Sequence, residues 1–256
     1  MKFWLSFSLL LCLLVPAAVF AEDGRVTRIL RSVDEQYALK TDAAASVVVT
    51  QQKVDQGTKV IGMQYYRRDA DHNFLIVMTA PESDKGNGYL RVADNFWMYR
   101  RNTRTFQHIS RDESIGGTDA HGEDFEDRKM IELYQPLTDA GGQELFSEEK
   151  LGQIPVIKFE VKAKVNDVDY PKKIYWVRRD NNLILKEEAY ALSGSLMQTA
   201  YYLKFTQIDG RYVAVKMFFI DEFEKGNKTV VEISNIKTDK LSDAIFTKAY
   251  LENLSK

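Results

Sequence analysis

Alternation of apolar and charged residues runs through most of this chain and constrains its fold more than any other feature. The clearest case is VIKFEVKAKV at 156–165, where apolar side chains occupy the odd positions from Ile157 to Val165 and charged ones the even positions. A period of two places the two sets on opposite faces of a β-strand. The segment therefore predicts a strand with one apolar and one charged face.

About a dozen segments of this kind, joined by short turns such as Asp209-Gly210, predict an antiparallel meander. They span residues 45–54, 59–68, 73–80, 89–92, 95–100, 104–110, 156–165, 172–179, 183–192, 195–208, 211–223 and 228–237. Helical spacing is confined to 25–40, a piece across 123–135, and short pieces near 144–150 and 242–252. The prediction is a mostly β (α+β) protein with a single large curved antiparallel sheet and a few helices.

The first residues read as a leader for export. Lys2 precedes an apolar run from Phe3 to Val15 that is too short to span a bilayer, and small residues end at Ala21. We predict a cleaved signal peptide over 1–21 and one domain over 22–256. Cys12, the only cysteine, could instead carry a lipid anchor, but the leucines before it lack the small residues expected there. Its removal leaves no disulfide and no cysteine metal site.

The charge balance argues against nucleic acid as a partner. The chain has 35 basic and 37 acidic residues, with a net charge of −2, and the two signs are interspersed. A nucleic-acid-binding protein would need a basic stripe.

Hairpin register indicates where apolar faces meet. A two-residue loop at Asp94-Asn95 would place Val92 opposite Trp97 and Leu90 opposite Tyr99 on one wholly apolar face. A loop at Gln56-Gly57 would place Val48 on one face together with Ile61, Met63 and Tyr65. A concave apolar face needs helices or a ligand against it, and the predicted helices are too few. We therefore expect an apolar cavity; a closed sandwich without one stays open as an alternative.

Motifs for chemistry mostly fail. Asp69, Asp71 and Asn73 begin like a calcium loop, but Phe74 replaces the turn glycine, so a polar turn is predicted. The three histidines, 72, 108 and 121, have no metal-ligand spacing. The stretch around Gly194 lacks the outer glycines of a nucleophile elbow and reads as a hairpin turn.

The stretch GGTDAHGEDFEDRKM at 116–130 allows two interpretations. Its carboxylates, with His121 beside them, could hold a cation: Asp119, Glu123, Asp124 and Asp127. The favoured interpretation is a loop hinged at Gly116 and Gly117 that leads into a helix. Carboxylates in the first turns of that helix would complement its dipole.

Several stretches together resemble the outer-membrane lipoprotein-sorting protein family, which has the LolA/LolB-like fold. They are Pro81, Gly88-Tyr89-Leu90-Arg91, Asn95-Phe96-Trp97-Met98-Tyr99, Arg104, Ile109, Gly117-Thr118-Asp119, Glu123-Asp124-Phe125 and, near the end, Asp243-Ala244-Ile245-Phe246-Thr247. Two departures are Arg100, where the family often has proline, and Ala120, where it usually has an aromatic residue. If that aromatic residue plugs the cavity, its absence loosens the lid.

The resemblance implies an incomplete β-barrel whose concave apolar face, covered by helices, holds acyl chains of lipoproteins or another lipid in the periplasm. It also implies that 116–135 lies over the cavity mouth. The residues expected to form the lid and hinge are Gly116, Gly117, Asp119, Asp124 and Phe125. The residues expected to line the cavity are Met63, Tyr65, Leu90, Val92, Trp97 and Tyr99. No catalytic residue, metal or cofactor is expected.

Three functions follow from these expectations. The leading one is a monomeric periplasmic carrier of lipidated proteins or a lipid, working with inner- and outer-membrane lipoprotein machinery. The second is a periplasmic sensor or interaction protein on the same scaffold that regulates a membrane partner. The third is a hydrolase that uses His121 with Asp119 or Asp127.

Overall fold

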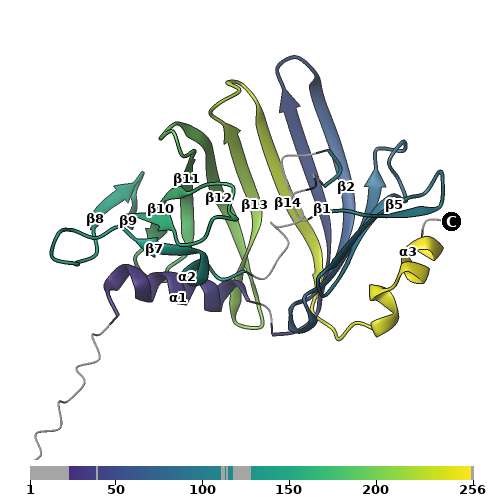
Figure 1. Cartoon of the computed structure of the whole chain (residues 1–256), viewed down its shortest axis with the longest axis horizontal. Coiled ribbons are helices and arrows are strands. Elements are labelled where there is room, and N and C mark those ends of the chain that lie inside the picture. Colours follow the sequence, from purple (N-terminus) through teal and green to yellow (C-terminus); the bar gives the residue numbers. More distant parts are fainter. Residues whose placement is uncertain (1–22, 39, 111–112, 114, 118–127, 255–256) are drawn as a thin grey trace, which may run out of the picture.

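The strands of the computed structural model, which describes residues 23–38, 40–110, 113, 115–117 and 128–254, form one 14-stranded antiparallel sheet (Figure 1). They are β1 (Ala43–Lys53), β2 (Gly57–Arg68), β3 (Asn73–Ala80), β4 (Gly88–Val92), β5 (Asn95–Arg100), β6 (Thr105–His108), β7 (Tyr134–Pro136), β8 (Phe146–Leu151), β9 (Ile154–Ala163), β10 (Lys172–Arg178), β11 (Ile184–Tyr190), β12 (Leu196–Ile208), β13 (Arg211–Asp221) and β14 (Lys228–Lys237). The predicted β-rich meander is confirmed. The predicted signal peptide lies outside the described residues.

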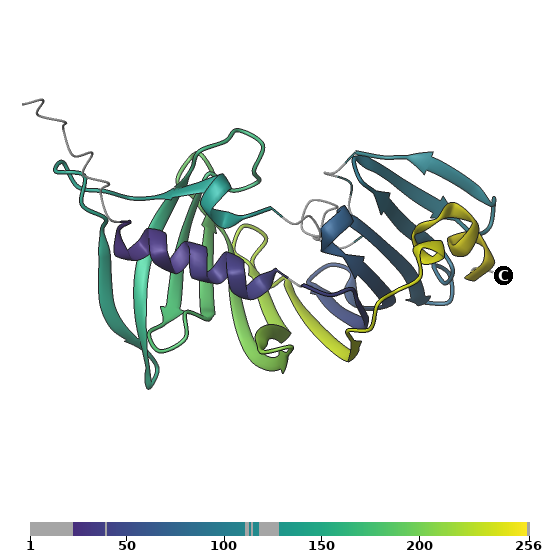
Figure 2. The same ribbon diagram turned by 90° about the horizontal axis from the view of Figure 1, so that it is seen from below.

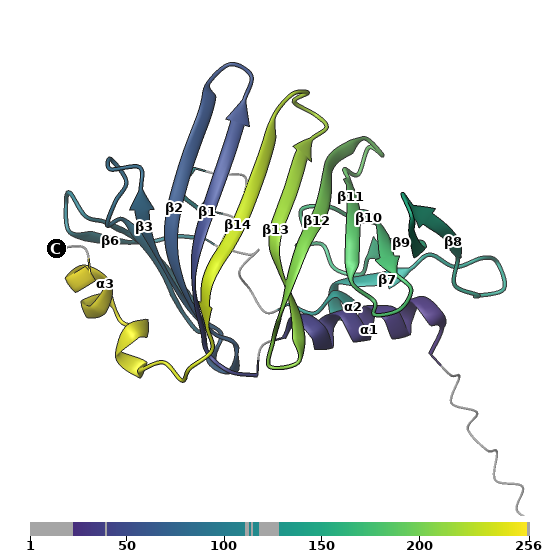
Figure 3. The same ribbon diagram turned by 180° about the vertical axis from the view of Figure 1, so that it is seen from behind.

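The strand order is β6-β5-β4-β3-β2-β1-β14-β13-β12-β11-β10-β9-β7, with β8 pairing β9 beside β7. The first and last strands are thus neighbours in the middle of the sheet. In the part of the chain that the structure describes, no pairing joins β6 to β7 or β8, so the curved sheet stays open (Figures 1 and 3). The expectation of an incomplete barrel is confirmed.

Helices α1 (Arg25–Tyr37), α2 (Met130–Leu133) and α3 (Lys248–Leu254) accompany the sheet, together with the 3-10 turns η1 (Asp69–Asp71) and η3 (Asp243–Phe246). The helices expected at 25–40 and 242–252 are confirmed, the second broken at Thr247. The expected piece across 123–135 appears in the described residues only as α2, because Tyr134 already pairs with Ala163.

The helical piece predicted near 144–150 is wrong. Its residues form β8, which pairs with β9 from Phe146 opposite Phe159 to Leu151 opposite Ile154. Glutamate and lysine are good helix formers, but helix propensity is a small term, and pairing with the open edge of β9 outweighs it. In this position Glu148 also forms ion pairs with Arg25 (2.6 Å) and Arg179 (3.0 Å).

The sheet has an inner face, defined here as the one on which α1 packs, and an outer face. The buried side of α1 contacts strands β9 to β11, while η3 and α3 cover β3 to β5 on the outer face (Figure 2). Side chains that are paired across adjacent antiparallel strands lie on the same face. Following these pairs from Phe159 to Tyr175, and then strand by strand across the sheet, shows that Val49 and Met63 also lie on the inner face.

Three apolar clusters hold the molecule together. Cluster 1 lies on the inner face under α1 and includes Val26, Ile29, Leu30, Val33, Phe159, Val161, Tyr175 and Val177. Cluster 2 lies on the inner face of β1 to β5 and includes Val47, Val49, Ile61, Met63, Phe74, Ile76, Met78, Tyr89, Phe96, Ile109 and Ile115. Cluster 3 lies on the outer face and includes Leu75, Val77, Leu90, Tyr99, Phe246 and Leu251.

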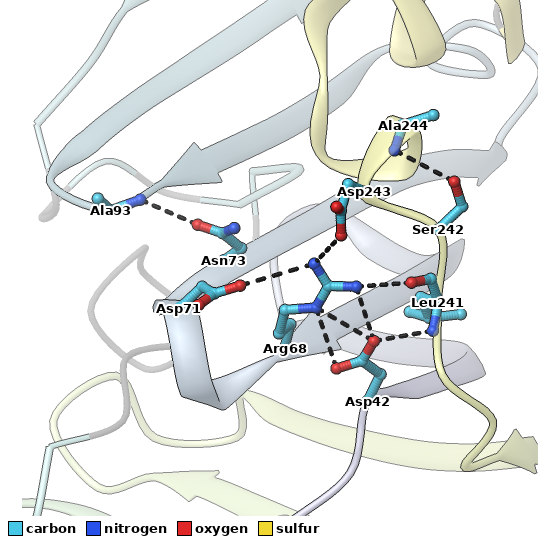
Figure 4. Close-up of polar contacts among 9 residues, drawn as sticks. All are labelled: Asp42, Arg68, Asp71, Asn73, Ala93, Leu241, Ser242, Asp243 and Ala244. Carbon is cyan, nitrogen blue, oxygen red and sulfur yellow. Dashed lines mark hydrogen bonds and ion pairs between the residues drawn. The ribbon is translucent and has the colours of Figure 1, made fainter.

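The register of two hairpins differs from the prediction. In β4–β5 the loop is Ala93-Asp94, so Val92 pairs with Asn95 and Leu90 with Trp97. Asn73 Oδ1 accepts the Ala93 N–H (3.0 Å), which holds the loop at this position (Figure 4). A shift of two residues keeps every side chain on its predicted face.

The predicted register of the β1–β2 hairpin is wrong, and so is the face that it gave to Val48. Lys53 pairs with Gly57, which leaves a three-residue loop followed by a glycine at φ 76°, a combination common in hairpins. The shift from the expected register is odd, so Val48 moves to the outer face opposite Gly62. Val48 is 37% exposed there, apart from Met63 and Tyr65.

A buried arginine fastens the C-terminal segment to the sheet (Figure 4). The Arg68 guanidinium donates to both carboxylate oxygens of Asp42 (2.9–3.1 Å), to Asp243 (2.6 Å) and to the Leu241 carbonyl (2.6 Å). Burial alone would raise the pKa of Asp42, but its hydrogen bonds with Arg68 and the Leu241 N–H outweigh burial and lower it. The hydrogen bonds to Asp42 and Asp243 raise the pKa of Arg68. Both groups stay charged and paired at neutral pH.

Candidate functional site

The six residues expected to line a cavity lie on opposite faces of the sheet. Met63 and Tyr65 are on the inner face with cluster 2. The other four, Leu90, Val92, Trp97 and Tyr99, are on the outer face with cluster 3. The prediction that all six share one lining is therefore wrong.

The four outer residues do not line a cavity, because η3 and α3 of the same chain cover them. The Lys248 Nζ lies 4.2 Å from the Trp97 ring centroid, and Leu251 is fully buried beside Leu90 and Tyr99. The apolar face that the sequence predicted on β4–β5 is real, but a helix of the same chain covers it. Sequence alone could not say on which side of the sheet that face lies.

Of the two hinge glycines that the structure describes, Gly116 packs closely against cluster 2, whereas Gly117 is exposed. Gly116 and Gly117 have φ values of 64° and 69°, which favour glycine. The Gly116 N–H donates to the Tyr89 hydroxyl (2.9 Å), and a Cβ at Gly116 would lie 2.8 Å from Met78 Cε. The other expected lid residues, Asp119, Asp124 and Phe125, lie outside the described residues, as does His121.

Between clusters 1 and 2, the inner face of the central strands is apolar and incompletely covered. Tyr202 pairs with Met217, and Ala200 with Phe219; Met217 in turn pairs with Val231, which pairs with Val49. We define the central inner face as Tyr202, Met217, Phe219, Val231 and Ile233, all half-buried. Apolar side chains that keep part of their surface exposed on a concave face provide a place for an apolar ligand.

The sequence analysis missed Met217 and Phe219. They lie in the run Met-Phe-Phe-Ile at 217–220, where both faces of β13 are apolar and the alternation disappears. The signal that could have found them is the pairing with β12 and β14, which requires the register of both hairpins.

A polar group borders the central inner face beneath α1. Lys173 and Glu187 form an ion pair (2.7 Å), and the Tyr202 hydroxyl lies 3.5 Å from the same carboxylate. The Tyr37 hydroxyl is buried and has no hydrogen-bond partner among the described residues. Burial, and then the charge of Glu187, raise the pKa of Tyr37, so its phenol is neutral. Tyr37 is therefore a buried, neutral hydrogen-bond donor close to this polar group.

A carboxylate of α1 binds the start of α2. Asp34 accepts the N–H groups of Met130 (2.7 Å) and Ile131 (3.0 Å), the first residues of α2. Burial raises the pKa of Asp34, and these two hydrogen bonds partly oppose that effect. Asp34 thus anchors α2 beside α1.

Two sequence interpretations of turns are confirmed. Residues 69–71 form η1, where Asp69 pairs with Arg67 and Asp71 lies 3.6 Å from Arg68, a polar turn. Gly194 sits in the β11–β12 turn at φ 86°. Within the described ranges, no group of three His, Cys, Asp or Glu side chains is placed to hold a metal ion. No described helix is long and apolar enough to cross a membrane.

Several solved structures share this fold. The LolA superfamily protein NE2245 from Nitrosomonas europaea is 23% identical, with a TM-score of 0.70 over 87% of this chain and 97% of that one. An outer membrane lipoprotein-sorting protein domain from Vibrio parahaemolyticus is 18% identical, with a TM-score of 0.74 over 88% and 97%. A DUF1329 family protein from Desulfovibrio piger is 22% identical, with a TM-score of 0.73 over 88% and 98%.

These likenesses confirm the fold that the resemblance implied. No curated protein matches the chain closely enough to count as a relative. A family model described as "Uncharacterized protein" matches residues 70–253, which is most of the chain. The chain therefore belongs to that family and has the fold of the LolA superfamily.

Proposed function

We propose that the protein is a periplasmic carrier that holds acyl chains of lipidated proteins, or another apolar lipid, against the central inner face. The observation that carries this proposal is the half-buried apolar surface of Met217 and Phe219, which belong to neither inner cluster. The shared fold with a lipoprotein-sorting protein domain supports it. The leader-like sequence at 1–21 supports the periplasmic location.

The physical driving force is transfer of methylene groups out of water. Burial contributes about 0.8 kcal/mol for each CH₂ group. A saturated chain lying across β13 and β14 would replace water on the exposed parts of these side chains. Such binding needs no reacting group, so the proposed function involves no catalysis.

Adjacent residues of β13 supply a matched test. Phe219 faces inward, whereas Phe218 pairs with Val230 on the outer face and stacks with Tyr201 (6.5 Å between ring centroids). Phe219→Ala should weaken binding of a fluorescent fatty acid about tenfold, because the ligand covers only the exposed part of this half-buried ring, which is worth about half of the roughly 1.5–3 kcal/mol for a fully buried side chain. Phe218→Ala should leave the affinity within about twofold of the parent.

Binding is measured by fluorescence titration, and native mass spectrometry of the purified protein identifies what it carries. Thermal melting confirms that both variants are folded. A wild-type protein that takes up no acyl probe, or a Phe219→Ala variant with unchanged affinity, would contradict the proposal.

A further inference from the structure

Among the described residues, the three most exposed large apolar side chains all lie in hairpin turns. They are Leu192 (92% exposed), Phe223 (71%) and Val54 (65%). Leu192 is in the β11–β12 turn, Phe223 in the β13–β14 turn and Val54 in the β1–β2 turn. Single exposed apolar residues are common, but three on consecutive hairpins form a pattern.

The three turns lie side by side at one end of the strands (Figures 1 and 3). Their strands are adjacent in the order β2-β1-β14-β13-β12-β11. The Val54 N–H donates to Asn227 Oδ1 (3.0 Å), which joins the first turn to the second. The Glu222 N–H donates to the Met197 carbonyl (2.8 Å), which joins the second turn to the start of β12, next to the third turn. We call Val54, Leu192 and Phe223, with their turns, the tip surface.

The turns at the opposite end of the strands are polar. Those between β2 and β3, β10 and β11, and β12 and β13 carry Asp69 and Asp71, Asp180 and Asn182, and Asp209. The C-terminal end of α1 lies at that end, because Gln36 donates to the Asn181 carbonyl (2.9 Å), and Thr41, which follows the helix, donates to Asp209 (3.2 Å). The three most exposed apolar side chains therefore lie together at one end of the molecule, whereas the less exposed ones, such as Leu203 and Leu254, are scattered elsewhere.

Hydrogen bonds hold Phe223 in its exposed position. Asp221 Oδ1 accepts the N–H groups of Phe223 (2.9 Å) and Glu224 (2.7 Å), and Glu224 in turn accepts from Asn227 Nδ2 (2.7 Å). A turn ordered in this way presents its aromatic ring to the surroundings at little further cost in conformational entropy.

We propose that the tip surface docks the protein on a lipid bilayer by inserting these three side chains among the acyl chains. A bilayer accepts separate protruding side chains without shape complementarity, whereas a protein partner of ordinary size needs a continuous packed patch. The residues at 52–58, 191–195 and 221–228 include three lysines and four acidic residues. Attraction to anionic headgroups is therefore not the driving force, and binding is apolar.

Docking through the tip surface would also bring the central inner face close to the bilayer. Phe219 lies two residues before Asp221, where the β13–β14 turn begins, and the C-terminal end of α1 lies at the opposite end of the strands. The docking surface is independent of what the inner face holds, so it can be tested on protein without ligand.

The test is flotation of the full chain with phosphatidylcholine vesicles. We expect the wild-type protein to bind, with less than a twofold change between 0.1 and 0.5 M salt. The double variant Leu192→Ser, Phe223→Ser should bind at least tenfold more weakly. Leu203→Ser is the matched control, since Leu203 is 57% exposed on β12 away from the turns, and it should bind like the wild type.

Hydrogen exchange of the unmodified protein gives a second measurement. Vesicles should slow exchange in the turns around Val54, Leu192 and Phe223 and leave the Asp209-Gly210 turn unchanged. The proposal is wrong if the wild type does not float, if the double variant floats equally well, or if salt abolishes binding. It is also wrong if the wild type ignores vesicles and instead dimerises through the tip surface.

Discussion

Arg68 shows how one residue determines where the C-terminal segment lies. It is 8% exposed and donates to Asp42, Asp243 and the Leu241 carbonyl, so three segments meet at one guanidinium. Arg68 was visible in the sequence only as the charged end of a strand, because Asp42 and Asp243, the carboxylates to which it donates, lie 26 and 175 residues away. Such a contact depends on the fold and cannot be inferred from local pattern.

We expect Asp42→Asn to lower the free energy of unfolding by about 3 kcal/mol at pH 7, because it leaves a buried guanidinium charge without its main partner. The pKa of Asp42 is lowered in the folded protein. Its contribution is therefore present above the unfolded value, near 3.8, and is lost as pH falls through the folded value.

The Asp42 prediction is measured by urea unfolding at several pH values between about 2 and 7. The variant should show a flatter pH dependence than the wild type below about pH 4. Asp71→Asn is the control, since Asp71 is 58% exposed at 3.6 Å from Arg68 and should change stability by less than about 1 kcal/mol. Equal effects of the two substitutions would refute this account of Arg68.

At the scale of elements, the sequence predicted where the strands lie along the chain but not which face of the sheet their apolar side chains occupy. The alternation in β9 and the turn residues around it predict a strand regardless of context. Which face of β4–β5 lies inside depends on where α1 and α3 pack, and both helices are amphipathic. The apolar face of Leu90 and Trp97 was consequently assigned to a ligand when its partner is α3.

Helix α3 offers a direct test of that assignment. Leu251→Ala should reduce the free energy of unfolding by about 2–4 kcal/mol, because Leu251 is fully buried against Leu90 and Tyr99. Leu254→Ala, at a position that is 45% exposed on the same helix, should cost less than about 1 kcal/mol. Chemical denaturation measures both values, and a small effect at Leu251 would contradict the packing of α3.

Helix α2 depends on Asp34 of α1. Asp34→Ala removes the acceptor of the Met130 and Ile131 N–H groups, so we expect both amides to exchange at least tenfold faster. Glu35→Ala, whose side chain is exposed, is the control and should leave them unchanged. Hydrogen exchange monitored by mass spectrometry reports on both variants. Unaltered exchange in Asp34→Ala would mean that other contacts hold α2.

At the scale of the whole molecule, a bound acyl ligand should add stability by mass action. A ligand at a hundred times its dissociation constant contributes about 2.7 kcal/mol, which raises the Tm of a domain of this size by about 5–10 °C. Delipidated protein should therefore melt lower than protein supplied with a fatty acid. Phe219→Ala should reduce the difference, and identical melting of loaded and delipidated wild type would count against the carrier.

The open sheet could be predicted as a whole because its strands are local in sequence, whereas the central inner face could not. That face is formed by β12, β13 and β14, beside β1, and the Met-Phe-Phe-Ile run in β13 gives no alternation to assign. The β1–β2 loop adds a further uncertainty, since one residue more or less in it reverses which side chains point inward. A site built from several strands can be predicted only if the pairing register of every one of those strands is known.

The pairing of β1 with β14 has a consequence for how the chain acquires its structure. The N-terminal half, β1 to β6, can form its hairpins early, but β1 stays unpaired on one side until residues 228–237 are available. Contacts so distant in sequence slow folding and postpone the joining of the two halves. For the proposed periplasmic location, this delay would let the central ladder complete only after the last strand has crossed the membrane.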